Sequence, residues 1–303
     1  MIEQLLRIRR EYPIKKYQTT KDWSLDYYKV TKNNDPIDKA IIGGFLCQQF
    51  SFAFLAGYQA ALEQMFPAVA PNQLKALCVS EAKGGHPKSI ETSLVDQKIT
   101  GVKTYITAGT EVEHLLILCK TNEVIKERPV LKIVHVPMDV YGMEVTNFEL
   151  PFMKDIKHGK AAMNEISIKA DQILDGDGYS QYTKPFRTLE DVCVSAAYQA
   201  MLLRQAIDHK WEDNLRDQLL LNIYTLKNIL TLAPLEAETH LLLSAADHSF
   251  QIMLPAINKH IAENTEEHFK MDWEANKKIL TLGEKIKAIR ISKARNLLFS
   301  FPA

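Results

Sequence analysis

The stretch GVKTYITAG, from Gly101 to Gly109, lies between two glycines and is rich in β-branched residues, with one lysine and one tyrosine among them. This composition is typical of a β-strand, because β-branched and aromatic side chains pack well on a pleated surface. Two interpretations of its polar residues stay open from the stretch alone. It is either an edge strand with ordinary cross-strand packing residues, or a strand whose polar edge faces a bound ligand.

The sequence on both sides of this stretch has the same β-rich character. Short runs, of which LKALCVS is the first and AAMNEISI the last, are separated by turn sequences such as AKGGHP and DVYG. Seven such runs occur within about a hundred residues, which is the density expected of an all-β domain. This spacing favours an antiparallel β-sandwich or barrel.

Helical periodicity surrounds the β-rich region. Pro36 and Asp38 predict the start of a long apolar helix, which should end near Pro67 because proline cannot continue a helix. From about Lys184 onward, four runs carry one apolar stripe each and predict a four-helix bundle. The expected class is therefore α+β, with an N-terminal helical region (1–72), a central antiparallel β-sandwich or barrel domain (73–182) and a C-terminal helical bundle (183–303).

Composition and charge exclude several classes of function. Lys and Arg together number 37, as do Asp and Glu, so no global field attracts nucleic acid or an anionic membrane. The most apolar window, Ile41–Leu62, is interrupted by glutamine and serine, which favours a buried core helix over a membrane span. Four widely spaced cysteines without a CxxC pair or a zinc pattern predict reduced thiols, no metal site and a cytoplasmic location.

Four motifs in the β-rich region occur in an order that is itself informative. They are SEAKGGHP, ITGVKTYITAG, EVEHLLIL and VPMDVYGMEV, and ISIKADQILDGDGY follows them. This series resembles the β-domain of the acyl-CoA dehydrogenase family and its linker into the C-terminal bundle, over about residues 73–210. The resemblance implies a flavoprotein that uses FAD to oxidise an acyl-CoA or a related thioester between its alpha and beta carbons. It also implies an electron-accepting flavoprotein as partner and a homo-oligomer.

The resemblance assigns roles to individual residues of the strand and of the segment before it. Tyr105 would flank the isoalloxazine ring, and Thr107 would donate a hydrogen bond near its reactive nitrogen. Ser80 takes the place of the family's threonine and would meet the pyrimidine side of the ring. Lys103 falls on the family's lysine and is expected to be structural rather than catalytic.

The segment that would meet the cofactor's phosphates departs from the family pattern. Gly84 and Gly85 are expected to let the backbone approach the cofactor closely. His86 and Pro87 replace residues that include the serine that helps to hold the pyrophosphate, although a histidine can also donate to phosphate. The double-glycine loop of the family's C-terminal bundle has no counterpart, since no double glycine follows Gly85.

The catalytic base requires a carboxylate near the alpha carbon of the substrate. A minority of the family places it in the first bundle helix, and Glu190 in TLEDV falls on that position, with Asp191 where the family has arginine. An acidic residue in the first turn of a helix also stabilises the macrodipole without any catalysis, so both interpretations stay open. The later glutamates Glu263, Glu266 and Glu267 are expected to form a solvated helix start.

Two functions compete on these observations. One is an active FAD-dependent dehydrogenase of the acyl-CoA dehydrogenase type. The other is a degenerate homologue that keeps the scaffold, has lost catalysis and binds a partner protein. The shortened N-terminal region, with only 72 residues before the β-domain, favours the second, whereas the retained SEAKGG and GVKTYITAG segments favour the first.

Overall fold

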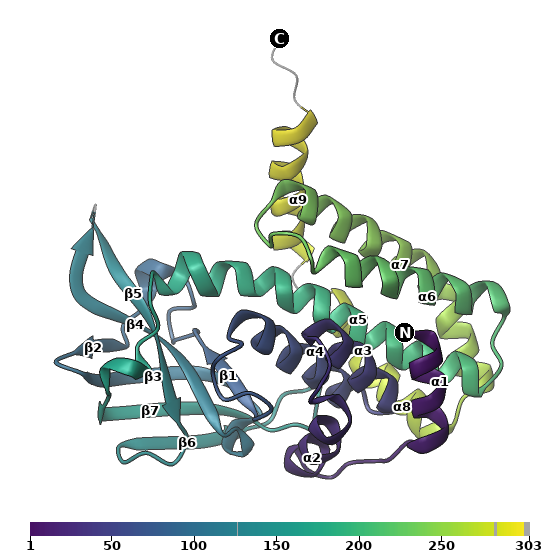
Figure 1. Cartoon of the computed structure of the whole chain (residues 1–303), viewed down its shortest axis with the longest axis horizontal. Helices are drawn as coiled ribbons and strands as arrows, with labels where there is room; N and C mark the ends of the chain where they lie inside the picture. The colour runs from purple at the N-terminus through teal and green to yellow at the C-terminus, as the bar shows by residue number, and fades with distance from the viewer. Residues whose placement is uncertain (126, 282–283, 300–303) are drawn as a thin grey trace. The chain divides into compact units, whose positions relative to one another are not determined.

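The computed structural model describes residues 1–125, 127–281 and 284–299, and the chain forms two compact units (Figure 1). The helical unit contains Met1–Tyr17, Lys29–Ala61 and the chain from Thr188 onward. The sheet unit contains Gln18–Tyr28 and Leu62–Arg187. The α+β class expected from the sequence is confirmed.

The helical unit is built on two apolar helices near the N-terminus and on long helices near the C-terminus. Proline at the first position of α3 suits a helix start, since its missing N–H would have no partner there. The helices that lie wholly or mostly in this unit are α1 (Ile2–Glu11), α3 (Pro36–Leu46), α4 (Phe50–Met65), α5 (Lys184–Asp208), α6 (Asp213–Ile229), α7 (Ala237–Asn264), α8 (Glu267–Asn276) and α9 (Glu284–Phe299).

The single long helix expected from Pro36 to near Pro67 is divided in two. The backbone of Cys47 is extended, which ends α3. Tertiary hydrogen bonds hold this break, because the Gln49 side chain bonds the backbone of Tyr17 in both directions, at 2.7 and 3.1 Å. The carboxylate of Asp272 then accepts the first amide of α4, Phe50 N–H, at 2.6 Å. The expected end of the apolar segment, just before Pro67, is confirmed.

These two apolar helices are buried, as their all-round hydrophobicity predicts. Ile41, Phe45 and Leu55 are completely inaccessible to solvent. A methyl group in place of hydrogen at Gly44 or Gly57 would collide with the α5 backbone, so both glycines permit very close helix packing. No helix within residues 1–125, 127–281 and 284–299 is long and apolar enough to cross a membrane.

The C-terminal helices contain one more interruption than the sequence suggested. The last of the four predicted apolar runs, which begins at Trp273, is divided among α8, a 3₁₀ segment (Lys277–Thr281) and α9. Helix α9 contacts α7 through an ion pair between Lys287 and Asp247 at 3.0 Å. Arg290 of α9 also bonds Asp191 of α5 at 2.8 Å.

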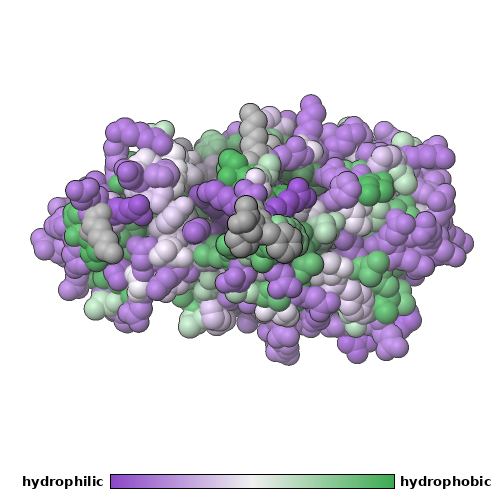
Figure 2. Space-filling view, turned by 90° about the horizontal axis from the view of Figure 1, so that it is seen from above, coloured by the Kyte–Doolittle hydropathy of each residue, from purple (hydrophilic) through white to green (hydrophobic). Residues whose placement is uncertain are grey.

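Some apolar side chains of the helical unit remain exposed. On the face drawn in Figure 2, hydrophilic side chains predominate and apolar side chains lie between them. The exposed apolar residues on α7 and α9 include Leu242, Ile252, Ile286, Ile289 and Leu297.

Among the described residues of the sheet unit, seven strands form one sheet in the order β1-β4-β2-β3-β7-β6, with β5 also paired to β4. Its pairings are mixed rather than purely antiparallel, because β1 and β2 both run parallel to β4. Parallel pairing needs a long connection, and residues 79–113 supply it between β1 and β4. The strands are β1 (Lys75–Cys78), β2 (Ser93–Val95), β3 (Lys98–Thr107), β4 (His114–Ile125), β5 (Arg128–Pro137), β6 (Met143–Phe148) and β7 (His158–Ser167).

Shorter elements complete the sheet unit. Helix α2 (Thr20–Thr31) begins beside the sheet connection, where the Thr20 amide donates to Glu111 at 2.8 Å. A 3₁₀ helix, η1 (Pro87–Ser89), follows β1, and a π-helical turn (Gly178–Thr183) leads into α5.

All four cysteines are buried, and within the described residues none of them forms a disulfide. Cys47 and Cys193 lie in the helical unit, and Cys78 and Cys119 in the sheet unit. Burial raises the pKa of the Cys78 and Cys119 thiols to about 12, and it raises the pKa of Cys193 further. No cluster of metal-ligating side chains is present in the described part of the chain.

Candidate functional site

Strand β3, which contains the GVKTYIT sequence, has a different environment on each edge. It pairs with β7 along its length, but only Lys98–Thr100 pair with β2. Further along that second edge, the Thr104 amide donates to the carbonyl of Ser80 at 2.9 Å. The strand is therefore neither a plain edge strand nor fully interior, and the segment after β1 lies directly beside its second half.

A β-bulge decides which side chains of β3 share a face. Lys103 is opposite Ala161 of β7 and Ile106 is opposite Gly159, so β3 contains one extra residue between these pairs. The extra residue reverses the alternation of side chains. Lys103 and Ile106 therefore lie on one face of the sheet, and Tyr105 lies with Thr107 on the other.

The face with Tyr105 and Thr107 contains an aromatic cluster. His158 is paired with Thr107 on one side and with Phe148 of β6 on the other, so all three side chains project in the same direction. The Tyr105 ring lies 5.1 Å from the His158 ring and 5.9 Å from Phe148, centroid to centroid. Tyr105 is half-buried, whereas Thr107 is 5% exposed and His158 1% exposed.

His158 is the polar residue of this cluster that sequence reasoning missed. Neither of its ring nitrogens has a hydrogen-bond partner with good geometry among the residues that the structure describes. Burial lowers the pKa of the imidazole to about 4, opposed in part by the backbone of Ile156. The ring is therefore neutral at neutral pH. Only the strand register reveals this residue, since the sequence HGKAAM does not show that it lies opposite Thr107.

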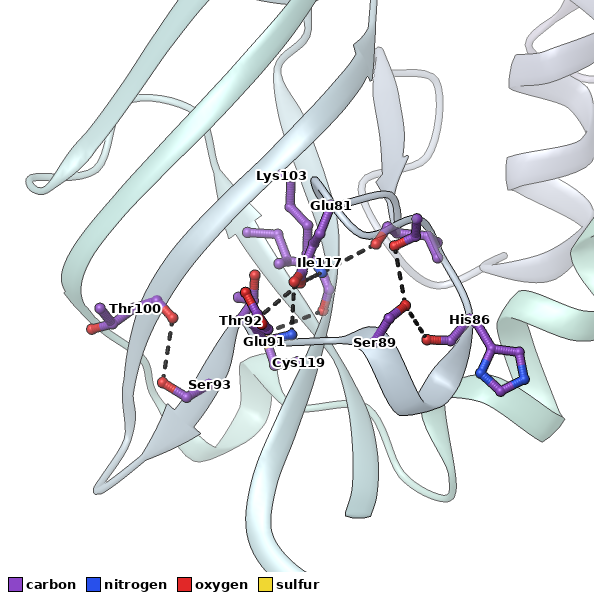
Figure 3. A network of polar contacts seen from close by, with 12 residues as sticks. Glu81, His86, Ser89, Glu91, Thr92, Ser93, Thr100, Lys103, Ile117 and Cys119 are labelled. Atoms are coloured by element: carbon purple, nitrogen blue, oxygen red, sulfur yellow. Dashed lines mark hydrogen bonds and ion pairs between the residues drawn. The ribbon is translucent and has the colours of Figure 1, made fainter. Parts of the chain in front are cut away.

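The opposite face contains a buried ion pair between β3 and the segment after β1 (Figure 3). Lys103 Nζ is 2.7 Å from Glu81 Oε1 and 3.3 Å from the Val79 carbonyl. The Glu81 carboxylate also accepts the Glu91 amide at 2.7 Å and the Thr92 amide at 3.1 Å. Burial alone would raise the pKa of Glu81, but these hydrogen bonds and the Lys103 charge hold it below its usual value.

The predicted phosphate-side residues lie on the loop that this carboxylate anchors. Glu81 and Gly84 exchange backbone hydrogen bonds of 3.2 and 2.8 Å, which close a tight turn. Gly84 has a φ of +94°, a conformation that favours glycine, and open space lies beside it. His86 is exposed, and its Nδ1 accepts the Lys88 amide at 3.2 Å at the start of η1. The structure thus brings Ser80, the two glycines and His86 onto one loop next to β3.

Glu190 lies in the helical unit, on α5, and is half-buried. Helix α5 begins at Lys184, so Glu190 is in the second turn, where the macrodipole explanation is weaker. Burial is the main cause of the raised pKa of Cys193 and Tyr198 on the same helix, and the charge of Glu190 adds to it. Glu266 and Glu267 are exposed at the start of α8, as expected, whereas Glu263 is exposed in the last turn of α7 rather than at a helix start.

Comparison with known proteins finds matches among solved structures only. No family model matches the sequence, and no curated protein matches it either. Among solved structures, an FAD-dependent dehydrogenase is 15% identical, with a TM-score of 0.67 over 98% of this chain and 96% of its own. PigA, solved with FAD and proline, is 12% identical, with a TM-score of 0.67 over 98% and 93%.

A third solved structure is a putative acyl-CoA dehydrogenase from Mycobacterium smegmatis, 12% identical, with a TM-score of 0.62 over 98% of this chain and 96% of its own. Agreement over nearly the whole length of both chains defines the architecture. The chain has an acyl-CoA dehydrogenase-like fold. At this level of identity the likeness establishes the fold, and function has to be argued from the residues.

Proposed function

We propose that this chain is an FAD-binding flavoprotein whose isoalloxazine ring lies against the β3 face that contains Tyr105 and Thr107. The observation that carries the proposal is the grouping of a half-exposed tyrosine, a threonine hydroxyl and an unpartnered histidine on one face of the sheet. A flavin needs a flat wall and hydrogen-bond partners along its edge, and this grouping offers both. The fold shared with FAD-dependent dehydrogenases supports the same location.

Different residues of this chain would contact different parts of the cofactor. Tyr105 would form the flat wall, Thr107 would donate a hydrogen bond at the reactive edge, and Ser80 would meet the pyrimidine side. Open space lies beside Gly84, whereas Gly85 packs closely against Val79, so the backbone at Gly84 could approach the phosphates, to which the exposed His86 would donate. When bound, FAD would accept a hydride from the substrate.

The proposed reaction is oxidation of an acyl-CoA or a related thioester between its alpha and beta carbons. Glu190 would take the alpha proton as general base. An electron-accepting flavoprotein would reoxidise the protein, which would act as a homo-oligomer in the cytoplasm. We further propose that residues 1–72, 73–182 and 183–303 correspond to the helical, β-sandwich or barrel and bundle modules of the family, with α5, α6, α7 and α9 as the bundle.

A second candidate function is a degenerate scaffold that binds a partner protein without catalysis. Two hydrogen bonds in the loop after β1 favour it. The Gly84 amide is used in the turn with Glu81, and the imidazole of His86 accepts the Lys88 amide. Fewer donors are therefore available to a pyrophosphate than in a loop dedicated to phosphate binding.

The visible absorbance spectrum of the purified protein separates these two functions. The protein is desalted, its spectrum is recorded, FAD is added and the desalting is repeated. Flavin bands that survive desalting would support the proposed cofactor site, and reduction by acyl-CoA thioesters would then test the reaction. A colourless protein that retains no added FAD would refute the flavoprotein and favour the scaffold.

A further inference from the structure

The loop between β1 and β2 is closed by one side chain. The Glu81 carboxylate accepts the amides of Glu91 and Thr92 at the far end of the loop, at 2.7 and 3.1 Å. It therefore joins the two ends of a segment that contains Gly84, Gly85 and His86. Figure 3 shows these contacts converging at Glu81.

The same carboxylate connects the loop to β3. Lys103 Nζ bonds Glu81 Oε1 at 2.7 Å, and neither side chain is accessible beyond 5%. Lys103 is two residues before Tyr105 on the strand. A second connection is adjacent, because the Thr104 amide donates to the Ser80 carbonyl at 2.9 Å.

Stability alone is a poor explanation for such a pair. Removing two charges from water costs about as much as their attraction returns, and apolar residues of similar volume often stabilise a fold equally well. A pair that is completely buried and also bonds two loop amides instead fixes the loop in one geometry. Fixing a binding segment in advance reduces the entropy lost when a ligand binds.

We infer that Glu81 and Lys103 are positioning residues that hold the Gly84–His86 segment at a fixed distance from Tyr105 and Thr107, so that loop and strand contact one FAD molecule together. The inference rests on the proposed flavin site. It assigns neither residue a contact with the cofactor. It requires that removing the ion pair weaken FAD binding even in a variant that still folds.

A double variant, Glu81→Gln with Lys103→Met, tests this directly. Methionine fills most of the volume of the lysine chain and glutamine is neutral, so no buried charge is left unpaired. Glutamine keeps one acceptor oxygen, enough for one of the two loop amides, which donate to different oxygens of Glu81. The matched control is Glu165→Gln with Lys98→Met, which makes the same changes in an exposed ion pair of 3.1 Å between β3 and β7. Urea unfolding, the dissociation constant for FAD and the visible flavin spectrum are measured for all three proteins.

The expected result for the first variant is a cooperative urea transition at a somewhat lower midpoint, because one loop amide loses its acceptor, with FAD binding weakened about tenfold or more. In the control, FAD binding should stay within about twofold of wild type. Residual bound flavin should also show a spectrum closer to that of free FAD. Equal dissociation constants in two folded proteins would overturn the inference while leaving the flavin site intact. Failure of the wild-type protein to bind FAD would overturn the proposed function and this inference with it.

If the double variant does not fold, Glu81→Asp replaces it. Aspartate keeps both charges but is one methylene shorter, so it cannot reach Lys103 and both loop amides at once. Weaker FAD binding in a folded Glu81→Asp protein would support the inference, and unchanged binding would overturn it.

Discussion

Acidification should destabilise this protein through His158. The folded-state pKa of about 4 lies below the ordinary value of 6.5, so the folded protein keeps the ring neutral while the unfolded chain takes up a proton. The stabilising contribution is therefore complete above pH 6.5 and is lost progressively as the pH falls towards 4.

The magnitude follows from the two pKa values. The full difference corresponds to about 3 kcal/mol, at roughly 1.4 kcal/mol per pKa unit, and this is an upper limit because solvent screens part of it. Between about pH 7.5 and pH 4.5, linkage assigns about 2.5 kcal/mol of lost unfolding free energy to this residue. The variant His158→Phe keeps an aromatic ring beside Tyr105 and Phe148 but cannot be protonated.

Urea unfolding of both proteins at a series of pH values measures this contribution. Burial also lowers the pKa of His114 and His135, which are hydrogen-bonded to each other at 2.9 Å, so the variant should retain some acid sensitivity. The free energy of wild type should fall more steeply than that of His158→Phe, by at most about 2.5 kcal/mol over the range. Parallel curves for the two proteins would refute the argument that His158 is buried in its neutral form.

Four further predictions concern single substitutions. Lys103→Met alone should cost about 3–5 kcal/mol in urea unfolding, because it leaves the buried Glu81 carboxylate without its charge partner, and a loss below about 1 kcal/mol would contradict this. Tyr105→Ala should release flavin on desalting while costing only about 1–2 kcal/mol of stability, whereas Tyr141→Ala, at a fully exposed tyrosine, should release none. Glu190→Gln should retain flavin yet abolish its reduction by acyl-CoA thioesters in anaerobic stopped-flow, and equal rates would remove Glu190 as the base. Gly57→Ala should lower unfolding free energy by about 3 kcal/mol, since its methyl group meets the α5 backbone rather than a movable side chain, and an unchanged urea midpoint would argue against that close packing.

The order of helical and β-rich regions could be predicted from the sequence because hydrophobic periodicity and turn residues are local signals. The end of α4 before Pro67 follows from a proline in the same way. The break at Cys47 could not be predicted, since it depends on hydrogen bonds that Gln49 and Asp272 make with distant parts of the chain. The parallel pairing of β1 and β2 with β4 is equally non-local.

For the candidate site as well, local sequence motifs identify some residues, whereas pairing between distant segments determines how those residues are arranged. The motifs singled out Tyr105 and Thr107, and alternation would have placed Lys103 on their face. The bulge after Lys103 moves them to opposite faces, and no residue in GVKTYITAG signals it. Lys103 and its partner Glu81 are 22 residues apart, so their pairing emerges only when the loop folds back on the strand.

Alkylation of the four buried cysteines can be used to measure unfolding of the native protein. Burial raises the pKa of Cys78, Cys119 and Cys193, which disfavours their reactive thiolate form. A buried thiol meets an alkylating reagent only when the surrounding structure opens. Each unit contains two of them. Mass spectrometry after a brief pulse of reagent in rising urea would therefore follow the opening of each unit without any engineered probe. Simultaneous labelling at all four positions would mean one cooperative transition, and earlier labelling at Cys78 and Cys119 would mean that the sheet unit opens while the helices are still folded.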